Sequence, residues 1–406
     1  PASVADASGE VTRVEPLSWW TGMQTPLQLL VNGAGIAAYD VRIEGGQGVG
    51  VKARHKADSP NYLFVDVEVQ PDAEPGTYYL VFSQGERQFK VPYEIAARAE
   101  GSVARRSFTT ADMIYLLMPD RFANSDASND STPHTRERAD RSAFFGRHGG
   151  DLQGMIDHLD YIAGLGATAV WPTPLLLDDE PEGSYHGYAC GDYYRIDPRF
   201  GSNELYREFV GKAHDHGLKV IMDIVTNHCG TGHWWMKDLP FRDWIHQFPE
   251  YTGTNVCFST NMDPNASRYD LDLQESGWFV PSMPDMNLDN PYVLQYFKQW
   301  AVWWIEYAGL DGFRVDTYPY NEKVRGRTQG IPRFQHRGRM LDVVDPPTGI
   351  LAGRQSQQGR LRLAPAVDHG FPAAGGHLPG AAHRLAPLGR GHDARLRLPV
   401  ARFRLP

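Results

Sequence analysis

From residue 110 to residue 323 the sequence alternates short apolar runs with amphipathic segments, and this alternation restricts the fold more than any other feature. Four apolar runs are expected to be strands, at Met113–Met118, Ala167–Trp171, Lys219–Val225 and Gly312–Val315. Three amphipathic segments between them are expected to be helices, at Asp151–Gly166, Asn203–Gly217 and Pro291–Tyr307. Apolar strands that alternate with helices indicate a parallel sheet covered on both faces. Units of this size predict an α/β fold, the first half of a (β/α)8 TIM barrel at residues 105–228 and 291–323.

The N-terminal region, residues 1–98, has a different rhythm. Short β-type runs are separated by turn signals such as Asn32-Gly33 and Gln84-Gly85. The runs are Leu27–Val31, Tyr39–Ile43, Tyr62–Val69, Thr77–Phe82 and Gln88–Tyr93. Strands at this spacing predict an antiparallel β-sandwich of immunoglobulin type. Trp19 and Trp20 have two interpretations, a surface that stacks on carbohydrate or side chains packed in the core or against the next domain.

Residues 229–290, between the third barrel strand and its helix, are long and irregular. A connection of this length is usually functional or a small domain of its own. We therefore expect an inserted domain, a domain B, after the third strand.

The last segment, residues 324–406, differs in composition from everything before it. It holds 14 Arg and 4 Asp but neither Lys nor Glu, and Gly, Pro, Ala and Arg fill 45 of its 83 positions. No helical or strand periodicity persists there. One interpretation is a frameshift or similar artefact in a GC-rich gene, starting near Val324, and the other is a real, disordered tail.

Composition limits the classes of function. The net charge of −9 argues against general nucleic-acid binding, and without an apolar run of 18 residues we expect no membrane span. Cys190, Cys229 and Cys257 are expected to be free or partly buried thiols, since a Cys190–Cys229 disulfide would require export. The start at Pro1, without Met or a leader, suits a processed protein and favours a periplasmic or secreted location. A cytoplasmic location and a homo-oligomeric assembly both stay open.

Polar residues stand where two of the expected strands end. The third strand ends in Asp223–His228, and the fourth contains Arg314 and Asp316. Alternation along a strand points Arg314 and Asp316 to the same side, into the mouth of a barrel. A buried Arg is expected to lower the pKa of the neighbouring carboxyl and keep it ionised, as a nucleophile attacking an anomeric carbon requires. A purely structural ion pair is the alternative.

Several strings together resemble the α-amylase superfamily, glycoside hydrolase family 13. Asp223–His228 is similar to its first conserved region, Gly312–Asp316 to its second, and Trp171–Pro174 to its second-strand region. Met283–Asn287 and the N-terminal sandwich resemble the neopullulanase and cyclomaltodextrinase branch. The resemblance covers roughly residues 10–323. It implies a retaining hydrolase of α-1,4-glucosidic bonds in cyclomaltodextrins, pullulan or maltooligosaccharides.

The resemblance also implies a role for each matching residue. Asp316 would be the catalytic nucleophile that forms a covalent glycosyl-enzyme, and Arg314 would orient it. Asp223 and Asn227 would be structural residues of the site. The sugar on the non-reducing side of the cleaved bond would be bound by His186, Tyr188 and His228.

A second polar cluster is similar to the calcium loop of related family members. Calcium prefers six to eight oxygen ligands, among them carboxylates and backbone carbonyls. The resemblance implies structural Ca²⁺ held by Asn124, Asp126, Asn129, Asp130, Asp151 and the Gly149 carbonyl. The alternative is a turn rich in Asn and Asp that binds no metal.

The chain departs from the family's pattern in two catalytic groups, the acid/base Glu and the Asp of a later His-Asp pair. A retaining glycosidase needs a second carboxyl group as acid and base, which the family supplies as a Glu after the fifth strand. Beyond Lys323 this chain contains no Glu, and we interpret His392-Asp393 as a chance match to the family's later His-Asp pair. As written, the chain is expected to be inactive or misfolded. An α-glucan-binding pseudoenzyme and a transglycosylase are the alternatives.

Overall fold

The computed structural model describes residues 11–255, 260, 263 and 265–321, together with the backbone of short strands between residues 334 and 363. Within these residues, no helix combines the length and the apolar composition that crossing a bilayer requires. Most of the segment from Val324 onward, whose composition differs from the rest, lies outside the described residues.

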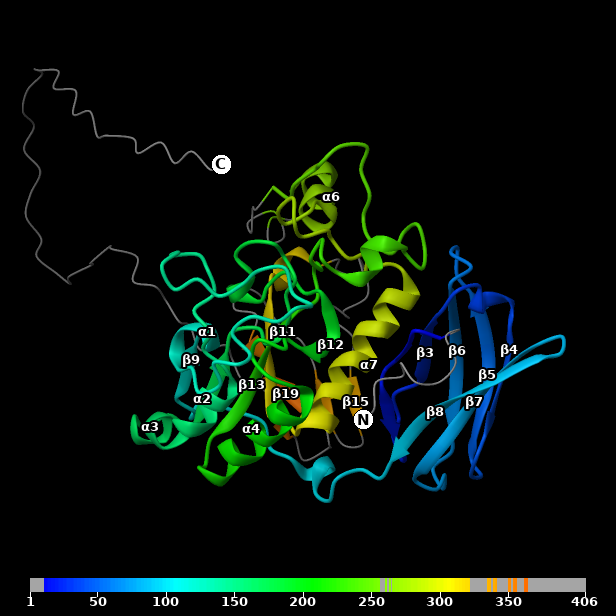
Figure 1. Ribbon diagram of the computed structural model, residues 1–406, viewed down its shortest axis with the longest axis horizontal. Helices are drawn as coiled ribbons and strands as arrows, with labels where there is room; N and C mark the ends of the chain where they lie inside the picture. The colour runs from blue at the N-terminus through cyan, green and yellow to red at the C-terminus, as the bar shows by residue number, and fades with distance from the viewer. Residues whose placement is uncertain are drawn as a thin grey trace, which may run out of the picture. The chain divides into compact units, whose positions relative to one another are not determined.

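Two four-stranded sheets form the N-terminal β-sandwich (Figure 1). One sheet has the order β1 (Arg13–Glu15), β3 (Leu27–Asn32), β6 (Tyr62–Val69) and β5 (Val49–Lys56). The other has the order β2 (Ser18–Trp20), β8 (Arg87–Ala96), β7 (Gly76–Gln84) and β4 (Asp40–Glu44). All five expected strands are present, and the predicted β-sandwich is confirmed. Its strands pair antiparallel as expected, except that β2 runs parallel to β8. Strands β1, β2 and β5 and the short 3-10 helix η2 (Ile36–Ala38) were not predicted.

The two adjacent tryptophans, Trp19 and Trp20, are buried in the sandwich. Trp19 is 1% exposed and Trp20 is 7% exposed, so neither offers a face on which a sugar could stack. Trp20 instead contacts Trp303 of helix α7 (Pro291–Ala308), with 6.4 Å between ring centroids. The interpretation as packed side chains is confirmed, and that of a stacking surface is wrong.

The second domain is built on a parallel sheet, as predicted. Its strands lie in the order β14 (Gly312–Asp316), β13 (Lys219–Val225), β10 (Ala169–Pro172) and β9 (Ile114–Leu117). In the register of β13 and β14, Asp223 lies beside Arg314 and Val225 beside Asp316. A further strand, β17 (Ile350–Leu351), pairs antiparallel with β14. The described part is thus a partial barrel that brings the polar ends of β13 and β14 together.

The helices follow the predicted order with one difference. Helix α4 (Asn203–Asp215) and α7 match the prediction, but the segment Asp151–Gly166 is two helices, α2 (Leu152–Asp157) and α3 (Leu159–Gly164). They are separated at His158, whose Nδ1 lies 2.7 Å from the Gly154 carbonyl. The remaining elements are short. They are η3 (Ser102–Ala104), α1 (Pro119–Phe122), β11 (Leu176–Leu177), η4 (Ser184–His186), β12 (Asp192–Ile196), η5 (Trp234–Lys237), α6 (Arg268–Ser276) and η6 (Tyr318–Tyr320).

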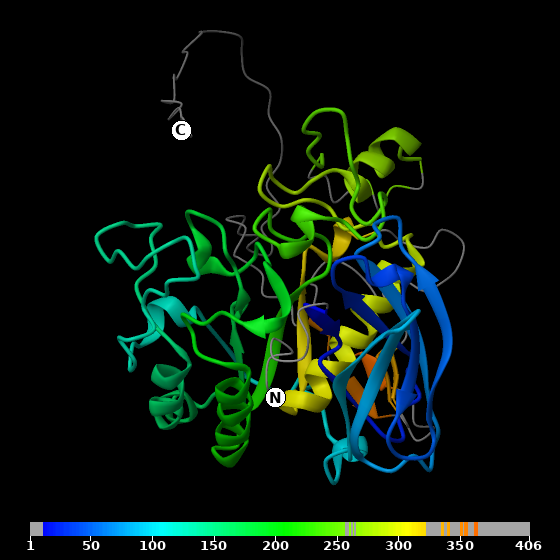
Figure 2. The same ribbon diagram turned by 45° about the vertical axis from the view of Figure 1, so that its right-hand side comes forward.

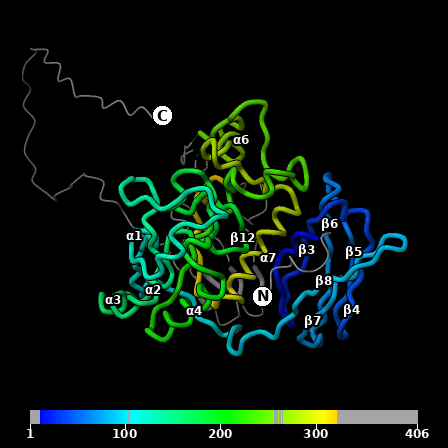
Figure 3. Tube along the Cα trace, in the orientation of Figure 1, coloured from blue at the N-terminus to red at the C-terminus, as the bar shows by residue number. Residues whose placement is uncertain are grey.

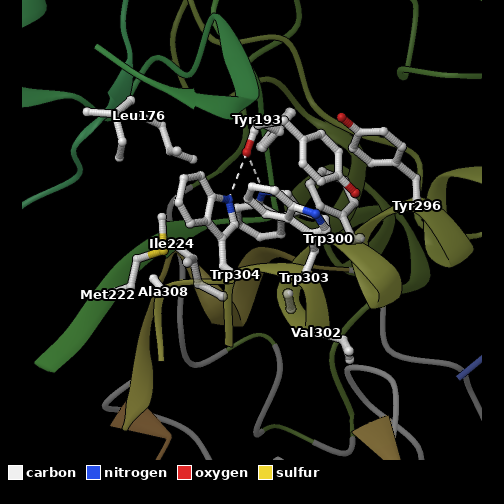
Figure 4. Close-up of a cluster of buried hydrophobic side chains, with 14 of the residues drawn as sticks. Leu176, Tyr193, Met222, Ile224, Tyr296, Trp300, Val302, Trp303, Trp304 and Ala308 are labelled. Atoms are coloured by element: carbon white, nitrogen blue, oxygen red, sulfur yellow. Dashed lines mark hydrogen bonds between the residues drawn. The ribbon is translucent and has the colours of Figure 1, made fainter. Parts of the chain in front are cut away.

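Helix α7 lies beside strand β3 of the sandwich, as Figures 1 and 2 both show. It begins at Pro291 after Asn290, whose side chain caps the free N–H groups of the first turn. Its aromatic face forms the center of the core in Figure 4, where Trp300 and Trp304 both donate indole N–H bonds to the Tyr193 carbonyl. The buried tryptophans therefore pack against the barrel without leaving their N–H groups unsatisfied.

The insert between β13 and α7 has little regular structure beyond η5 and α6, and it forms the protrusion at the top of Figure 3. Beyond Val324, strand β15 (Phe334–His336) pairs with β16 (Arg339–Leu341), and β18 (Gly353–Gln355) pairs with β19 (Leu361–Leu363). Strands of three residues are too short to show a periodic pattern in sequence, which is why none was predicted. Both interpretations of this segment remain predictions.

The cysteines agree with the expectation of free thiols where they are described. Cys190 and Cys229 are both buried and free, so they form no disulfide. Cys257 lies outside the described residues.

Candidate active site

Arg314 bridges two carboxylates at the end of the parallel sheet. Its Nη1 lies 2.6 Å from Asp316 Oδ1 and donates to both Asp223 oxygens, at 3.0 and 3.2 Å. The three side chains come from adjacent strands, so the register of β13 and β14 sets their spacing. The predicted grouping of Asp223, Arg314 and Asp316 is therefore present in the structure.

Two aromatic side chains complete this cluster from the neighbouring loop and strand. Trp171 Nε1 donates to Asp223 Oδ2 at 2.9 Å, and the Tyr188 hydroxyl donates to the same oxygen at 3.2 Å. The guanidinium of Arg314 lies over both rings, 5.2 Å from that of Trp171 and 5.9 Å from that of Tyr188. Tyr188 thus contacts the cluster directly, in addition to any contact with a sugar.

Burial and the shared arginine act in opposite directions on the two carboxyl groups. Burial raises the pKa of Asp223 to about 7, although Arg314 lowers it. The pKa of Asp316 is also raised, because burial outweighs the contacts with Arg314 and Thr317 that lower it. The sequence-based expectation that Arg314 holds the pKa of Asp316 below its ordinary value is therefore wrong. One guanidinium serves two carboxylates, so neither receives its full stabilisation.

Thr317, directly after Asp316, has an unusual backbone. Its φ of 50° and ψ of 25° place a β-branched residue in the left-handed region, which such residues rarely adopt. Conformations of this kind cost on the order of 1–3 kcal/mol and persist where the surroundings require them. The chain therefore turns sharply from β14 into η6 immediately behind the carboxylate of Asp316.

His228 and Asn227 form a second group at the end of β13. His228 is fully buried, its ring stacks on Phe279 at 5.2 Å, and burial lowers its pKa to about 3. Its Nε2 is buried without a hydrogen-bond partner among the described residues. Asn227 Nδ2 donates to Asp285 Oδ1 at 2.6 Å. His228 is therefore a neutral ring held by its neighbours.

His186 belongs to the loop that also carries Tyr188. Its Nδ1 accepts the backbone N–H of Tyr188 at 3.0 Å, and burial lowers its pKa. The two rings lie 5.8 Å apart, so His186 is placed beside the Tyr188–Asp223 contact. The three predicted sugar ligands thus lie on loops at the same end of the sheet as Asp316.

The predicted calcium loop is compact but contains no acidic metal cluster. Asn124 Nδ2 donates to Asp130 Oδ1 at 2.6 Å, and Asn129 Oδ1 is buried without a partner. A side chain at Gly149, where φ is 85°, would collide with Asn124 and Asp130. Among the residues that the structure describes, no three His, Cys, Asp or Glu side chains could share a metal ion. Any cation here would depend on amide and carbonyl oxygens as well.

Two predicted ligands of this loop already have protein partners. The carboxylate of Asp151 accepts the N–H groups of Asp126, at 2.8 Å, and of Gly154, at 2.6 Å, and so caps α2. The carboxylate of Asp126 accepts the Ser128 N–H at 3.0 Å.

Sequence reasoning did not assign site roles to three residues that the structure places here. Trp171 and Asp285 belong to the motifs Trp171–Pro174 and Met283–Asn287, and this position is the sequence signal for a role in the site. Phe279, against His228, carried no local signal, because its contact joins positions 51 residues apart in the chain.

Two protein families match this chain. The family described as "Alpha amylase, catalytic domain" matches residues 116–348, and "Cyclomaltodextrinase, N-terminal" matches residues 13–99. The first match therefore includes the start of the segment beyond Val324.

Individual proteins are similar to about half of this chain. The chain is 36% identical over 220 residues to a cyclomaltodextrinase from Thermoanaerobacter pseudethanolicus, covering 52% of this chain and 34% of that protein. It is 36% identical to neopullulanase 2 from Thermoactinomyces vulgaris, covering 52% of this chain and 35% of that protein. A solved α-amylase structure from Anoxybacillus is 34% identical, covering 52% and 42% of the two chains with a TM-score of 0.44. The chain thus spans about a third of the length of these curated relatives. It belongs to the α-amylase family and carries that family's cyclomaltodextrinase-type N-terminal domain.

Proposed function

We propose that this chain carries the nucleophile half of a retaining α-glucan hydrolase, acting on α-1,4 bonds of cyclomaltodextrins, pullulan or maltooligosaccharides. The observation that supports this most is the Arg314 bridge between Asp223 and Asp316 at the carboxyl ends of parallel strands. In parallel barrels, catalytic groups stand at these strand ends. Asp316 is the member with access to solvent, since its side chain is 17% exposed while that of Asp223 is fully buried.

In the proposed reaction, a carboxylate oxygen of Asp316 attacks the anomeric carbon as the bond to the leaving oxygen breaks. Arg314 holds the carboxylate in place and favours its ionised form, against the effect of burial. The proposed ligands of the sugar on the non-reducing side of the bond are His186, Tyr188 and His228. The ring of His228 is fully buried against Phe279, so in this proposal Phe279 moves aside when the sugar binds. Because the pKa of His228 is lowered to about 3, its ring is neutral at the pH at which such an enzyme works.

The leaving oxygen requires a proton, and the sequence beyond Lys323 offers no Glu to supply it. General acid catalysis contributes about 10²- to 10⁴-fold in rate. The chain is therefore expected to react only with substrates whose leaving group needs no proton. Glycosyl fluorides are such substrates, because fluoride leaves as an anion.

Fluoride release from α-maltosyl fluoride tests this proposal. The chain should release about one fluoride per molecule in a burst, followed by slow turnover, because no acid–base residue activates water for the second step. The variant Asp316→Asn should show no burst while binding maltoheptaose with unchanged affinity in a calorimetric titration. A burst of equal size from Asp316→Asn would refute Asp316 as the nucleophile.

A second candidate function is α-glucan binding without cleavage, which the absence of Glu beyond Lys323 favours. Under this alternative, maltoheptaose binds but α-maltosyl fluoride yields no burst. Within the hydrolase proposal, chromatography of the products from a maltooligosaccharide distinguishes hydrolysis from transglycosylation.

We also propose that the loop from Asn124 to Asp130, with Gly149 and Asp151, binds Ca²⁺ and thereby stabilises the fold. The oxygen-rich donor set and the unpartnered, buried Asn129 Oδ1 support this proposal. The predicted ligands are Asn124, Asp126, Asn129, Asp130, Asp151 and the Gly149 carbonyl. Asp126 and Asp151 would have to share oxygens that already accept backbone N–H groups.

Thermal unfolding with and without calcium tests the metal proposal. At a free concentration of 100 times Kd, binding to the native state alone should add about 2.7 kcal/mol of stability. The melting temperature should rise with CaCl₂, fall on addition of EDTA, and stop responding in Asn129→Ala. A melting temperature that is the same in CaCl₂ and EDTA would refute the site.

A further inference from the structure

A loop of the sandwich, residues 58–62, holds part of the insert that follows barrel strand β13. Two side chains of this loop converge on one carboxylate oxygen, since Ser59 Oγ and Asn61 Nδ2 each lie 2.8 Å from Asp238 Oδ2. Hydrogen bonds to a charged acceptor contribute about 1.5–3 kcal/mol each. Asp238 is therefore an anchor between two segments that are 177 residues apart in the chain.

Backbone groups add to this anchor on both sides. The Tyr62 hydroxyl donates to the Asp238 carbonyl at 2.6 Å. The Pro240 carbonyl accepts the N–H groups of Asp58 and Ser59, at 3.0 and 3.1 Å. In return, the carboxylate of Asp58 accepts the backbone N–H of Arg242 at 2.9 Å. The segment 238–242 is thus fixed at both of its ends.

Aromatic packing between strand β6 of the sandwich and the insert adds to these hydrogen bonds. Phe64 of β6 stacks on Phe241 at 5.5 Å and contacts Trp244 at 5.9 Å. Trp244 is fully buried. The sandwich therefore fixes the insert as far as Trp244, by packing as well as by hydrogen bonds.

The insert next contacts the Met283–Asn287 motif. Ile245 and Met286 form an isolated antiparallel bridge, and the His246 N–H donates to the Asp285 carbonyl at 3.0 Å. His246 Nδ1 also lies 2.8 Å from Asp285 Oδ2. The fully buried side chain of Asp285 is therefore placed by a residue only two positions beyond Trp244.

Asp285 in turn orients the amide of Asn227. A carboxylate only accepts, so the short contact at 2.6 Å turns Nδ2 of Asn227 toward Asp285 and its Oδ1 toward His228. His228 Nδ1 lies 3.1 Å from that oxygen and must donate to it. The Met286 N–H also donates to the Asn227 carbonyl, at 2.8 Å. This chain of contacts fixes both the tilt and the proton of the His228 ring.

We propose that loop 58–62 of the sandwich positions His228 for its sugar ligand, with Asp238 as the positioning residue that transmits the contact. The path runs from Asp238 through Trp244 and His246 to Asp285, and from there through Asn227 to His228. The ligand part of this inference rests on the proposed function, whereas the mechanical path does not. The sandwich is then part of the site's support and more than a neighbouring domain.

Hydrogen exchange of the full chain tests the path. Asp238→Ala should speed exchange at the protected N–H groups of Cys229 and Met286 about tenfold, because it removes two hydrogen bonds to a charged acceptor. Tyr62→Phe is the conservative variant and should act in the same direction by about threefold, since it removes one bond and keeps the ring.

Gln299→Ala is the matched control. Gln299 bonds the backbone of Gln28 in β3 from helix α7, and so crosses from sandwich to barrel away from the path. It should leave exchange at Cys229 and Met286 unchanged. Equal acceleration by Gln299→Ala and Asp238→Ala would overturn the path in favour of general loosening. No acceleration at Cys229 and Met286 in Asp238→Ala would overturn it as well.

Calorimetric titration with β-cyclodextrin tests the ligand part separately. Asp238→Ala should weaken binding about fivefold, and Gln299→Ala should not. Unchanged affinity in Asp238→Ala would overturn the positioning of His228 for sugar. If the unmodified chain binds no β-cyclodextrin while the exchange results hold, the proposed function fails and the path stands.

Discussion

Arg314 and Arg13 each bridge a pair of carboxylates, one pair in the candidate site and one where the sandwich meets the barrel. In the site, Arg314 serves Asp223 and Asp316. At the second place, Arg13 Nη1 lies 3.0 Å from Glu15 and 2.7 Å from Asp192. The pairs are chemically alike, because burial raises the pKa of one acid in each, Asp223 and Glu15, to about 7.

The two pairs differ in which member reaches solvent. At the domain junction the acids are sealed, with side-chain exposures of 1% for Glu15 and 3% for Asp192, and the arginine is 32% exposed. The Tyr296 hydroxyl donates to Glu15 at 2.8 Å and closes it off further. In the site the exposed acid is Asp316. An Arg bridging two acids is therefore no signature of catalysis by itself, and accessibility at a strand end separates the two cases.

The largest expected effect on stability is at the junction. Arg13→Leu leaves Glu15 and Asp192 buried without their common cation, which should lower the free energy of unfolding by about 3–5 kcal/mol in urea at pH 7. The matched control is Arg54→Leu, which breaks an exposed pair with Asp40 and should cost less than about 1 kcal/mol. Equal losses in both variants would show that the junction pair is no more than a surface contact.

The two pairs should each make the free energy of unfolding depend on pH in the same way. An acid whose pKa is about 7 in the folded state and about 4 when unfolded keeps its proton on folding, so stability falls as pH rises from about 4 to about 7. Asp223→Asn should remove that fall. The difference in free energy of unfolding between the variant and the unmodified chain should therefore be more favourable to the variant at pH 7 than at pH 4, by about 3–4 kcal/mol. Urea unfolding at pH 4, 5.5 and 7 measures this difference.

Glu15→Gln at the junction should likewise remove the fall in stability between pH 4 and pH 7, because the raised pKa of Glu15 has the same effect. If Asp223→Asn instead made the chain less stable at pH 7 than at pH 4, the raised pKa of Asp223 would be contradicted. If only one of the two variants responds, the electrostatic likeness of the two pairs fails.

The smallest expected effect on stability comes from the tryptophan rings that lie against Arg314 and Arg13. Trp171 lies 5.2 Å from the Arg314 guanidinium and also donates to Asp223, whereas Trp234 lies 4.7 Å from that of Arg13 and its Nε1 has no partner among the described residues. Trp171→Phe should therefore destabilise the fold by about 1 kcal/mol more than Trp234→Phe, the value of one hydrogen bond. Chemical denaturation of both variants measures the difference, and equal losses would mean that the Trp171–Asp223 bond contributes nothing.

Much of the fold was predictable, because its strongest signals are local. Strand β13 and helix α7 follow directly from the apolar run Lys219–Val225 and from Asn290-Pro291 before an aromatic segment. The missed strands show the limit. Strands β1 and β2 have three residues each, and β5 mixes charged residues into its alternation, so none shows a clear periodic pattern. The break between α2 and α3 lies at His158, whose φ of −118° and ψ of 18° are not helical, and no periodicity in the sequence indicates it.

In the candidate site, the sequence predicted which residues meet but not their electrostatic balance. Alternation along β14 was enough to place Arg314 beside Asp316. The expected lowering of the Asp316 pKa failed because burial and the sharing of Arg314 with Asp223 depend on the packed structure. The junction pair escaped prediction altogether, since Arg13 and Asp192 are 179 residues apart.

Covalent labelling tests the central claim, that Asp316 is a nucleophile and the junction acids are not. A 5-fluoro-α-glucosyl fluoride carries a leaving group that needs no proton and forms a glycosyl-enzyme that hydrolyses slowly, so it can label a chain without the acid. Peptide mass spectrometry should find one fluoroglucosyl group on the peptide containing Asp316, with none on Glu15 or Asp192 and none in Asp316→Asn. No label on the chain, or a label that persists in Asp316→Asn, would contradict the account.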